Sequence, residues 1–191
     1  MHQALFDTVE QMIPMTAKDK ELCLQYFRPF TYSKGELIEK AGTVHDYQNF
    51  IVSGHMRNFH VNEKGLEVTV DINEGPRFFS SYLAMMERRP SDENLQCITA
   101  CDILRVKRDD INIMLKESTI LKDYTILILQ HFLEEDKKRL TEMGNLTAEE
   151  RYRAFVQKNP MINRNVPLVY IASFLGIRPE SLSRIRRQLI S

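Results

Sequence analysis

No hydrophobic run in the sequence approaches the roughly 20 residues that a membrane-spanning helix needs. The first residues, Met-His-Gln-Ala-Leu-Phe-Asp, lack the basic start and the apolar core of a secretory signal peptide. Cysteine is scarce as well, with three residues, an odd number in a chain without an export signal. These absences predict a cytoplasmic protein with reduced thiols and no membrane partner.

Motifs of catalysis and metal binding are also missing. The sequence has no nucleophile motif, no glycine-rich phosphate loop and no paired carboxylates, so we expect a protein that is not an enzyme. The histidines show no metal-ligand spacing, which argues against zinc or haem. Cys23, Cys97 and Cys101 are too few for an iron–sulfur cluster, which normally takes four thiolates. We expect no metal and no cofactor, and we expect the cysteines to be small buried residues.

Charge is balanced over the chain but not along it. The 191 residues, 43% of them hydrophobic and 27% charged, are typical of a globular protein with one large domain or two small ones. Residues 141–191 contain eight Arg and Lys against four Glu, a net charge of +4, which leaves −4 for the remainder. A modestly basic C-terminal segment on an acidic partner is typical of an appended nucleic-acid-binding module.

The most informative motif lies at residues 168–189, where the spacing is that of a helix-turn-helix. Ala172 is small where two helices would cross, and Gly176 suits the tight turn, because a left-handed backbone costs little only without a β-carbon. Pro179 suits the first turn of the second helix, and Glu180 adds a negative charge near its positive end. The apolar positions that the two helices should bury are Ile171, Leu175, Ile177, Leu182 and Ile185.

The second helix of this motif has a cationic face, which predicts binding to double-stranded DNA. We expect Arg184 and Glu180 to touch bases, because arginine can bind guanine bidentately and glutamate can accept from cytosine. The side chains better placed for phosphates are Ser181, Ser183, Arg186 and Arg187. An ordinary helical hairpin would explain the buried seam alone, but not the small residue, the glycine and the cationic face together.

Before this motif the spacing of hydrophobic residues changes from helical to β and back to helical. Residues 3–27 have helical spacing, with Thr16 as a candidate N-cap and Asp19 in the first turn. From residue 30 to about 106, short β segments alternate with glycine turns, which predicts an antiparallel sandwich or barrel. The last two expected strands are 96–100 and 102–106. The strand at 67–72 alternates cleanly, so one of its faces should be wet.

Helical spacing returns with a short helix at 111–115 and a long one at about 120–143. The first half of the long helix is apolar on nearly every side, so two surfaces must cover it. One is the β domain, and the other is predicted to be a second copy of the helix, although a core helix of one domain is the alternative. The residues expected at this dimer seam are Leu121, Tyr124, Ile128 and Phe132.

A domain boundary follows the long helix. Thr147-Ala-Glu-Glu150 has the pattern of a capping box, in which hydroxyl and carboxylate each bond the other residue's amide. Asn159-Pro160 ends the helix that begins there, and residues 163–167 form a short connection to the helix-turn-helix. The predicted domains are residues 1–119, 120–143 and 144–191.

This order of elements resembles the Crp/Fnr superfamily of bacterial regulators, over nearly the whole chain. The β-domain fragments that resemble the family are Phe-Thr-Tyr-Ser-Lys-Gly-Glu-Leu-Ile at 30–38, Ala-Gly at 41–42, Tyr-Gln-Asn-Phe-Ile-Val-Ser-Gly-His-Met-Arg at 47–57 and Lys-Gly at 64–65. The resemblance implies an α+β fold: an N-terminal antiparallel β-roll, a long dimerisation helix and a C-terminal winged helix-turn-helix. It also implies a homodimeric transcription regulator that binds two-fold DNA sites, with RNA polymerase as a further partner.

The sequence departs from the family pattern where cyclic nucleotides would bind. Nucleotide-binding members carry a Gly-Glu-Leu turn, whose glutamate bonds the ribose, and a downstream arginine that pairs with the phosphate. Here Ser80 or Ser81 stands near the place of that glutamate, and Asp92 and Glu93 downstream would repel a phosphate. We therefore expect an effector other than cyclic AMP. The candidate effector pocket consists of Arg77, Ser80, Ser81 and Leu83, although solvated turn charges are the expected role of Arg77, Arg88 and Arg89.

A second departure lies in the reading helix. Members that recognise a guanine-containing half-site often use Arg-Glu followed by Arg, and here Pro179 takes the first of these positions while Glu180 and Arg184 match the others. The half-site should therefore resemble the usual one without being identical to it. Two other functions remain open: a β-roll that binds a ligand or protein without binding DNA, and a redox sensor that uses Cys97 and Cys101.

Overall fold

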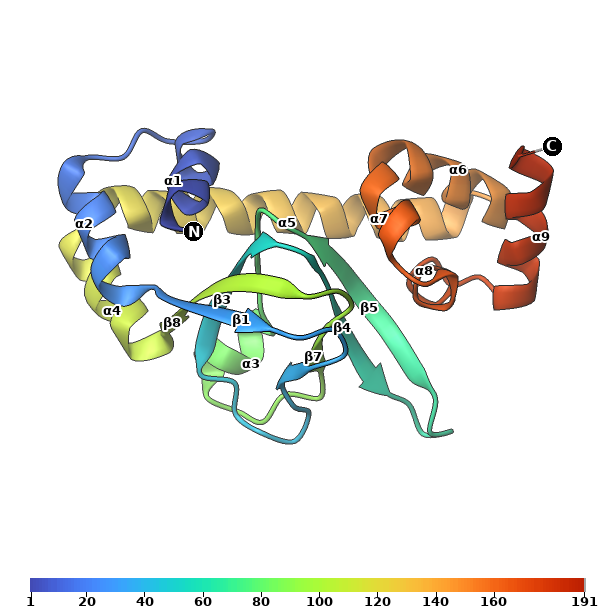
Figure 1. The fold of residues 1–191 in the computed structure, drawn as a ribbon, viewed down its shortest axis with the longest axis horizontal. Coiled ribbons are helices and arrows are strands. Elements are labelled where there is room, and N and C mark those ends of the chain that lie inside the picture. Colours follow the sequence, from blue (N-terminus) through green and yellow to red (C-terminus); the bar gives the residue numbers. More distant parts are fainter. Residues whose placement is uncertain (191) are drawn as a thin grey trace.

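One long helix, α5 (Thr119–Asn145), runs along the whole molecule (Figure 1). The β domain packs on one side of it, two N-terminal helices lie near its first turns, and the C-terminal helices gather at its far end. The structure is a computed structural model that describes residues 1–190. Ser191, the last residue of the predicted 144–191 domain, lies outside the described residues. The predicted helix at 120–143 is confirmed, with slightly wider bounds.

The β domain consists of two four-stranded antiparallel sheets, as expected. The first has the order β1 (Arg28–Tyr32), β8 (Cys101–Lys107), β3 (Tyr47–Ser53), β6 (Arg77–Phe79), and the second has the order β2 (Leu37–Glu39), β7 (Asn94–Cys97), β4 (His55–Val61), β5 (Glu67–Glu74). Glycine is required at the turn from β3 to β4, because Gly54 has a φ of +104° and a β-carbon there would lie 2.5 Å from the Ala100 carbonyl oxygen.

Two parts of the β domain differ from the prediction. The strand expected at 96–100 is β7 at Asn94–Cys97, and the chain turns directly after it. The strand β6 and the short helix α3 (Tyr82–Glu87) were not predicted. β6 is a strand because Phe79 and its neighbours pair with Asn49 to Ile51 of β3, and such a distant partner leaves no pattern in a three-residue segment.

The N-terminal segment is helical as predicted, and Thr16 is confirmed as the N-cap of the second of its two helices. They are α1 (His2–Glu10) and α2 (Ala17–Tyr26), and the break falls where Thr16 caps α2. The hydroxyl of Thr16 accepts a hydrogen bond from the Asp19 amide at 3.3 Å, and the Thr16 amide donates to Asp19 at 2.7 Å. Asp19 also accepts a hydrogen bond from Ser118, the N-cap of α5, so this capping box joins the N-terminal helices to the long helix.

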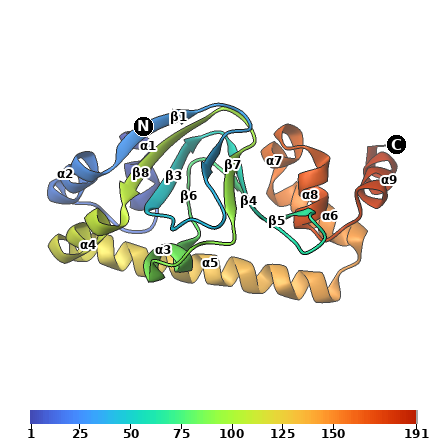
Figure 2. The same ribbon diagram turned by 90° about the horizontal axis from the view of Figure 1, so that it is seen from below.

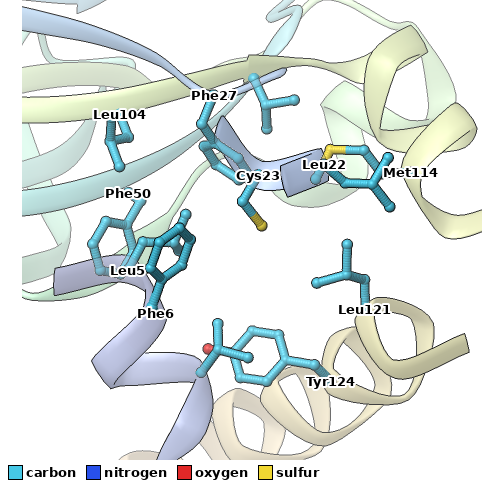
Figure 3. Close-up of a cluster of buried hydrophobic side chains, with 12 residues drawn as sticks. Leu5, Phe6, Leu22, Cys23, Phe27, Phe50, Leu104, Met114, Leu121 and Tyr124 are labelled. Carbon is cyan, nitrogen blue, oxygen red and sulfur yellow. The ribbon is translucent and has the colours of Figure 1, made fainter. Parts of the chain in front are cut away.

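The first residues predicted for the dimer seam lie instead in the core of the β domain. Leu121 and Tyr124 are 7% and 4% exposed, and Figure 3 shows both pointing from α5 into the cluster that contains Phe6 and Cys23. Ile128 packs against the same cluster. The assignment of Leu121 and Tyr124 to a dimer seam is therefore wrong, because a helix that is apolar all round gives no signal of which face meets its own domain.

Every element after β8 in residues 108–190 is a helix. These are α4 (Arg108–Glu117), α5, α6 (Ala148–Lys158), α7 (Pro160–Asn165), α8 (Leu168–Phe174) and α9 (Pro179–Ile190). The capping box at Thr147 and Glu150 is confirmed, with hydrogen bonds of 2.8 and 3.3 Å. The expected connection at 163–167 lies mostly in α7, because Pro160 begins another helix. The family resemblance implied a β-stranded wing in the C-terminal module, and residues 108–190 contain no strand that could form it.

The face of β5 that was predicted to be wet is partly covered by protein. Thr69 is buried, and α8 packs along this strand. Figures 1 and 2 both place β5 beside the C-terminal helices. The sequence could not show this contact, because α8 lies about a hundred residues further along the chain. No helix in residues 1–190 is long and apolar enough to cross a membrane.

Candidate nucleic-acid interface and sensor cavity

The helix-turn-helix consists of α8, a turn at 175–178 and α9. Its predicted apolar residues are all buried: Ile171, Leu175, Ile177, Leu182 and Ile185. Ala172 is completely buried at the helix crossing, and its carbonyl accepts a hydrogen bond from the Ile177 amide at 2.9 Å. Gly176 has a φ of +63°, the left-handed conformation that the turn requires. These contacts confirm the predicted motif.

The predicted DNA-contacting residues lie on one helix, and the charged ones are exposed to solvent. Glu180, Arg184, Arg186 and Arg187 are exposed, and Ser181 and Ser183 are half-buried. Leu182 and Ile185 hold the opposite side of α9 in the core of the module. In Figure 1 the helix stands at the extreme end of the molecule, beyond the end of α5.

Two contacts that sequence reasoning missed fix this module to the end of α5. Arg151 of α6 donates to the carbonyl of Leu175 in the turn at 3.2 Å and to the carbonyl of Leu146 at 2.7 Å. A β-carbon on Gly176 would lie 3.3 Å from the Met143 methyl group, so α5 also reaches the turn. The sequence indicated Arg151 only as one charge among eight, since its partners are backbone carbonyls.

A cavity of about 750 Å³ lies between α5 and the β domain and extends toward the C-terminal helices. Of the predicted pocket residues, Arg77, Ser80 and Leu83 line it, whereas Ser81 is not among its lining residues in the described chain. Its apolar lining includes Phe78, Tyr124, Ile128 and Phe132. A large apolar cavity with a few polar groups is the usual form of a small-molecule site.

Arg77 connects three elements at this cavity. It donates to Asn73 of β5 at 3.0 Å and to Glu135 of α5 at 2.8 Å, and its guanidinium lies 4.8 Å from the centre of the Phe132 ring. Lys158 of α6 donates to the other oxygen of Glu135 at 2.8 Å. Burial opposes the charge of Glu135, but the hydrogen bonds from Lys158 and Arg77 outweigh it and lower its pKa from 4.5 to about 2.

Arg77 therefore has a structural partner and is not a solvated turn charge, which corrects the expectation. The other two arginines of that expectation are on the surface, as predicted. Arg88 pairs with Asp109, and Arg89 pairs with Glu87 at 2.7 Å, and all four side chains are more than half exposed. Neither of these two lies in the cavity lining of the described residues.

Ser81 faces away from the cavity and bonds a carboxylate. Its hydroxyl donates to Glu93 at 2.8 Å, and Asn58 of β4 donates to the same oxygen at 3.0 Å. The Glu93 amide donates to the Ser91 hydroxyl at 3.1 Å, which holds this segment beside α3. The structure therefore separates Ser81 from the other three residues of the predicted pocket.

The cysteines are buried and unpaired. Cys97 of β7 and Cys101 of β8 both belong to the cluster between the two sheets. A hydrogen bond with Cys101 together with burial raises the pKa of the Cys97 thiol, and the same hydrogen bond lowers the pKa of Cys101. The expectation of small buried residues is confirmed. In residues 1–190, no group of three or more His, Cys, Asp or Glu is placed to hold a metal ion.

Comparison with known proteins agrees with this geometry. Residues 29–118, from β1 to the end of α4, match the cyclic nucleotide-binding domain family. FixK2 of Bradyrhizobium japonicum is 20% identical, with 85% of this chain and 84% of that chain covered and a TM-score of 0.72. The chain has the fold of the Crp/Fnr regulators.

Further solved structures share this Crp/Fnr fold. The c-di-GMP-responsive global regulator CLP of Xanthomonas campestris is 13% identical, with 91% of each chain covered and a TM-score of 0.69. The catabolite activator protein of Thermus thermophilus is 18% identical, with 92% of this chain and 84% of that chain covered and a TM-score of 0.58. No curated protein sequence matches the chain.

The domain family that matches residues 29–118 is named for binding cyclic nucleotides, and one carboxylate of this chain is poorly suited to a phosphate. The Glu93 carboxylate lies beside α3, close to the serine that stands near the place of the family's ribose-binding glutamate. Its hydrogen-bond donors, Asn58 and Ser81, are both neutral. A phosphate beside them would meet a second negative charge, and neither of these two donors is an arginine that could pair with it. This observation disfavours the nucleotide that the domain family binds.

Proposed function

We propose that the protein is a homodimeric transcription regulator that reads two-fold DNA sites with α9. The observation that carries the proposal is the exposed face of α9, where Glu180 and Arg184 project from a packed helix-turn-helix. Arg186 and Arg187 extend the positive face for phosphates. In this proposal RNA polymerase is a further partner, and the chain catalyses no reaction of its own.

The proposed dimer contact is a stripe of exposed apolar residues on α5. Leu133 and Leu140 are 71% and 67% exposed and lie seven residues apart, and Ile126 continues the stripe seven residues earlier. Met143 is exposed near the end of the helix. A repeat of seven is the spacing by which two helices pack as a coiled coil, which favours a second copy of α5 as the partner. Parallel copies would place both reading helices at one end, about 34 Å apart on successive DNA turns.

A salt titration tests DNA binding against the alternative of a β-roll that binds only a ligand or a protein. If the arginines of α9 neutralise phosphates, affinity for duplex DNA should fall steeply as salt rises, because bound cations are released from the DNA. The preferred sequence is first selected from random duplexes with the whole chain. Absence of binding even at low salt would favour the alternative.

Replacing Arg184 with Ala should reduce sequence discrimination by about 1–3 kcal/mol, because a bidentate contact to a base edge is lost. The measurement is the affinity for the selected site and for random duplex, each by fluorescence anisotropy. Affinity for random DNA should change little. The matched control is Arg164→Ala, which removes an exposed arginine of α7 in the same module. An equal loss on both duplexes would show that Arg184 contacts phosphate instead.

The proposed effector is not cyclic AMP. Titration calorimetry with cyclic AMP should give no saturable heat, since the Glu93 carboxylate, held by the neutral side chains of Asn58 and Ser81, would repel the phosphate. The same protein sample should bind the selected DNA, which shows that it is folded and active. A saturable heat would contradict this proposal and keep the nucleotide as an effector. Tighter binding of the nucleotide by Glu93→Gln would then show that Glu93 only weakens it.

A further inference from the structure

The C-terminal helices α6 to α9 carry the proposed DNA-reading helix and are called the reading module below. This module contacts the β domain of the same chain as well as α5. The Thr69 amide of β5 donates to the hydroxyl of Ser173 on α8 at 2.9 Å. Arg139 of α5 donates to the Val70 carbonyl of the same strand at 2.9 Å. Ile72 belongs to the hydrophobic cluster of the helix-turn-helix. Figure 2 shows β5 reaching this module from the β domain.

At the centre of this contact lies a buried arginine. Arg57 of β4 is 2% exposed, and its guanidinium carbon lies 4.0 Å from the ring centre of Phe59 and 3.7 Å from the ring centre of Tyr170 on α8. One ring comes from the β domain and the other from the reading module. A guanidinium stacked on aromatic rings away from water is the strongest setting for a cation–π contact.

The polar edge of Arg57 is held by the β domain alone. Its Nε and Nη2 atoms donate to the side-chain oxygen of Gln96 on β7 at 2.9 and 2.7 Å, and Nη2 also donates to Glu67 of β5. These bonds fix the plane of the guanidinium, so the position at which Tyr170 can stack is fixed as well. The β domain therefore presents a preformed flat cation to α8.

With this contact formed, α9 lies at the end of the molecule, beside the end of α5 (Figure 1). We infer that Arg57 and Tyr170 are positioning residues that keep the reading helix in its DNA-binding orientation. The inference rests on the proposed function. A module released from the contact would sample other orientations, and its apparent affinity would fall by the fraction of time spent in the competent one.

The experiment compares three variants of the full chain by affinity for the selected DNA site. Tyr170→Ala should bind on the order of tenfold more weakly, because the stacking partner is lost. Tyr170→Phe, which keeps the ring, should bind like the parent. Arg57→Met should show the same loss as Tyr170→Ala although it lies in the β domain, and the double variant should lose no more than either single one.

Amide hydrogen exchange without DNA provides a readout that is independent of the proposed function. The Thr69 amide and the amides of α8 should exchange faster in Tyr170→Ala and Arg57→Met, while those of β3 and β8 stay protected, which also shows that the β domain is folded. A parent chain that binds no DNA would overturn the proposed function, and exchange would still test the contact. Unchanged exchange, or equal or tighter DNA binding by both variants, would overturn the inference.

Ser173→Ala covers the case in which the larger substitutions prevent folding. It removes the acceptor of the Thr69 amide and leaves both aromatic rings in place. Its DNA affinity should fall by a smaller factor, together with faster exchange at Thr69. Parent-like behaviour in both measurements would count against the positioning role of this contact.

Discussion

Replacing Leu133 and Leu140 together with glutamate is expected to convert the dimer into monomers and to weaken binding to a two-fold DNA site at least about a hundredfold. Both leucines are largely exposed on α5 and belong to the stripe proposed as the dimer contact. Four carboxylates facing one another in a coiled-coil seam would repel each other and leave no apolar surface to bury. The DNA affinity falls because each monomer then binds its half-site alone.

Sedimentation velocity measures the oligomeric state, and anisotropy on whole and half sites measures the DNA affinity. Leu24→Glu is the control. Leu24 is also an exposed leucine on a helix, but it lies on α2 and outside the proposed dimer contact. This control should remain dimeric. Dimers in the double variant would place the contact elsewhere, whereas monomers that retain full affinity for the two-fold site would contradict the role of pairing.

Replacing Arg105 with Met is expected to cost about 3–5 kcal/mol of unfolding free energy, because it leaves a buried carboxylate without its cation. Arg105 of β8 donates to Glu39 at 2.5 Å, to Asn49 at 2.7 Å and to the Tyr32 hydroxyl at 2.9 Å. Glu39 is buried, and its second oxygen lies 3.0 Å from the buried ring of His45. The arginine thus joins the two sheets through a charged cluster.

Urea denaturation followed by circular dichroism measures this loss. Arg88→Met is the control: Arg88 also pairs with a carboxylate, but both side chains are more than half exposed, so the change should be within about 1 kcal/mol. Adding Glu39→Gln to Arg105→Met should restore part of the stability, since the unpaired charge is then removed. A loss for Arg105→Met no larger than that of Arg88→Met would show that water or His45 compensates the carboxylate.

Features that depend on neighbours in sequence were predictable. The helix-turn-helix was identified because Ala172, Gly176 and Pro179 each meet a local requirement of that motif, and the structure gives each its expected role. The capping boxes at Thr16 and Thr147 follow from hydroxyls and carboxylates three residues apart. Most strands were found for the same reason, since glycine turns separate them and mark their ends.

Features that depend on distant partners were not predictable. The burial of Arg57 requires Tyr170, more than a hundred residues away, and a lone arginine in a strand carries no signal of such a partner. The correct face of α5 could not be chosen, because Leu121 and Leu133 are equally apolar, although one is buried in the β domain and the other exposed. The sequence also could not show that Glu135 forms ion pairs with both Arg77 and Lys158, because these two residues lie on other elements of the fold.

The shared cluster of Ile72, Ile98 and the C-terminal helices has a consequence for domain exchange. A chimera that grafts residues 146–190 onto the sensor of another regulator would leave Tyr170 and Ser173 without their partners Arg57 and Thr69. The hairpin formed by β4 and β5 would have to travel with the graft, although it precedes the junction by some seventy residues. The transferable unit for engineering is therefore discontinuous along the chain.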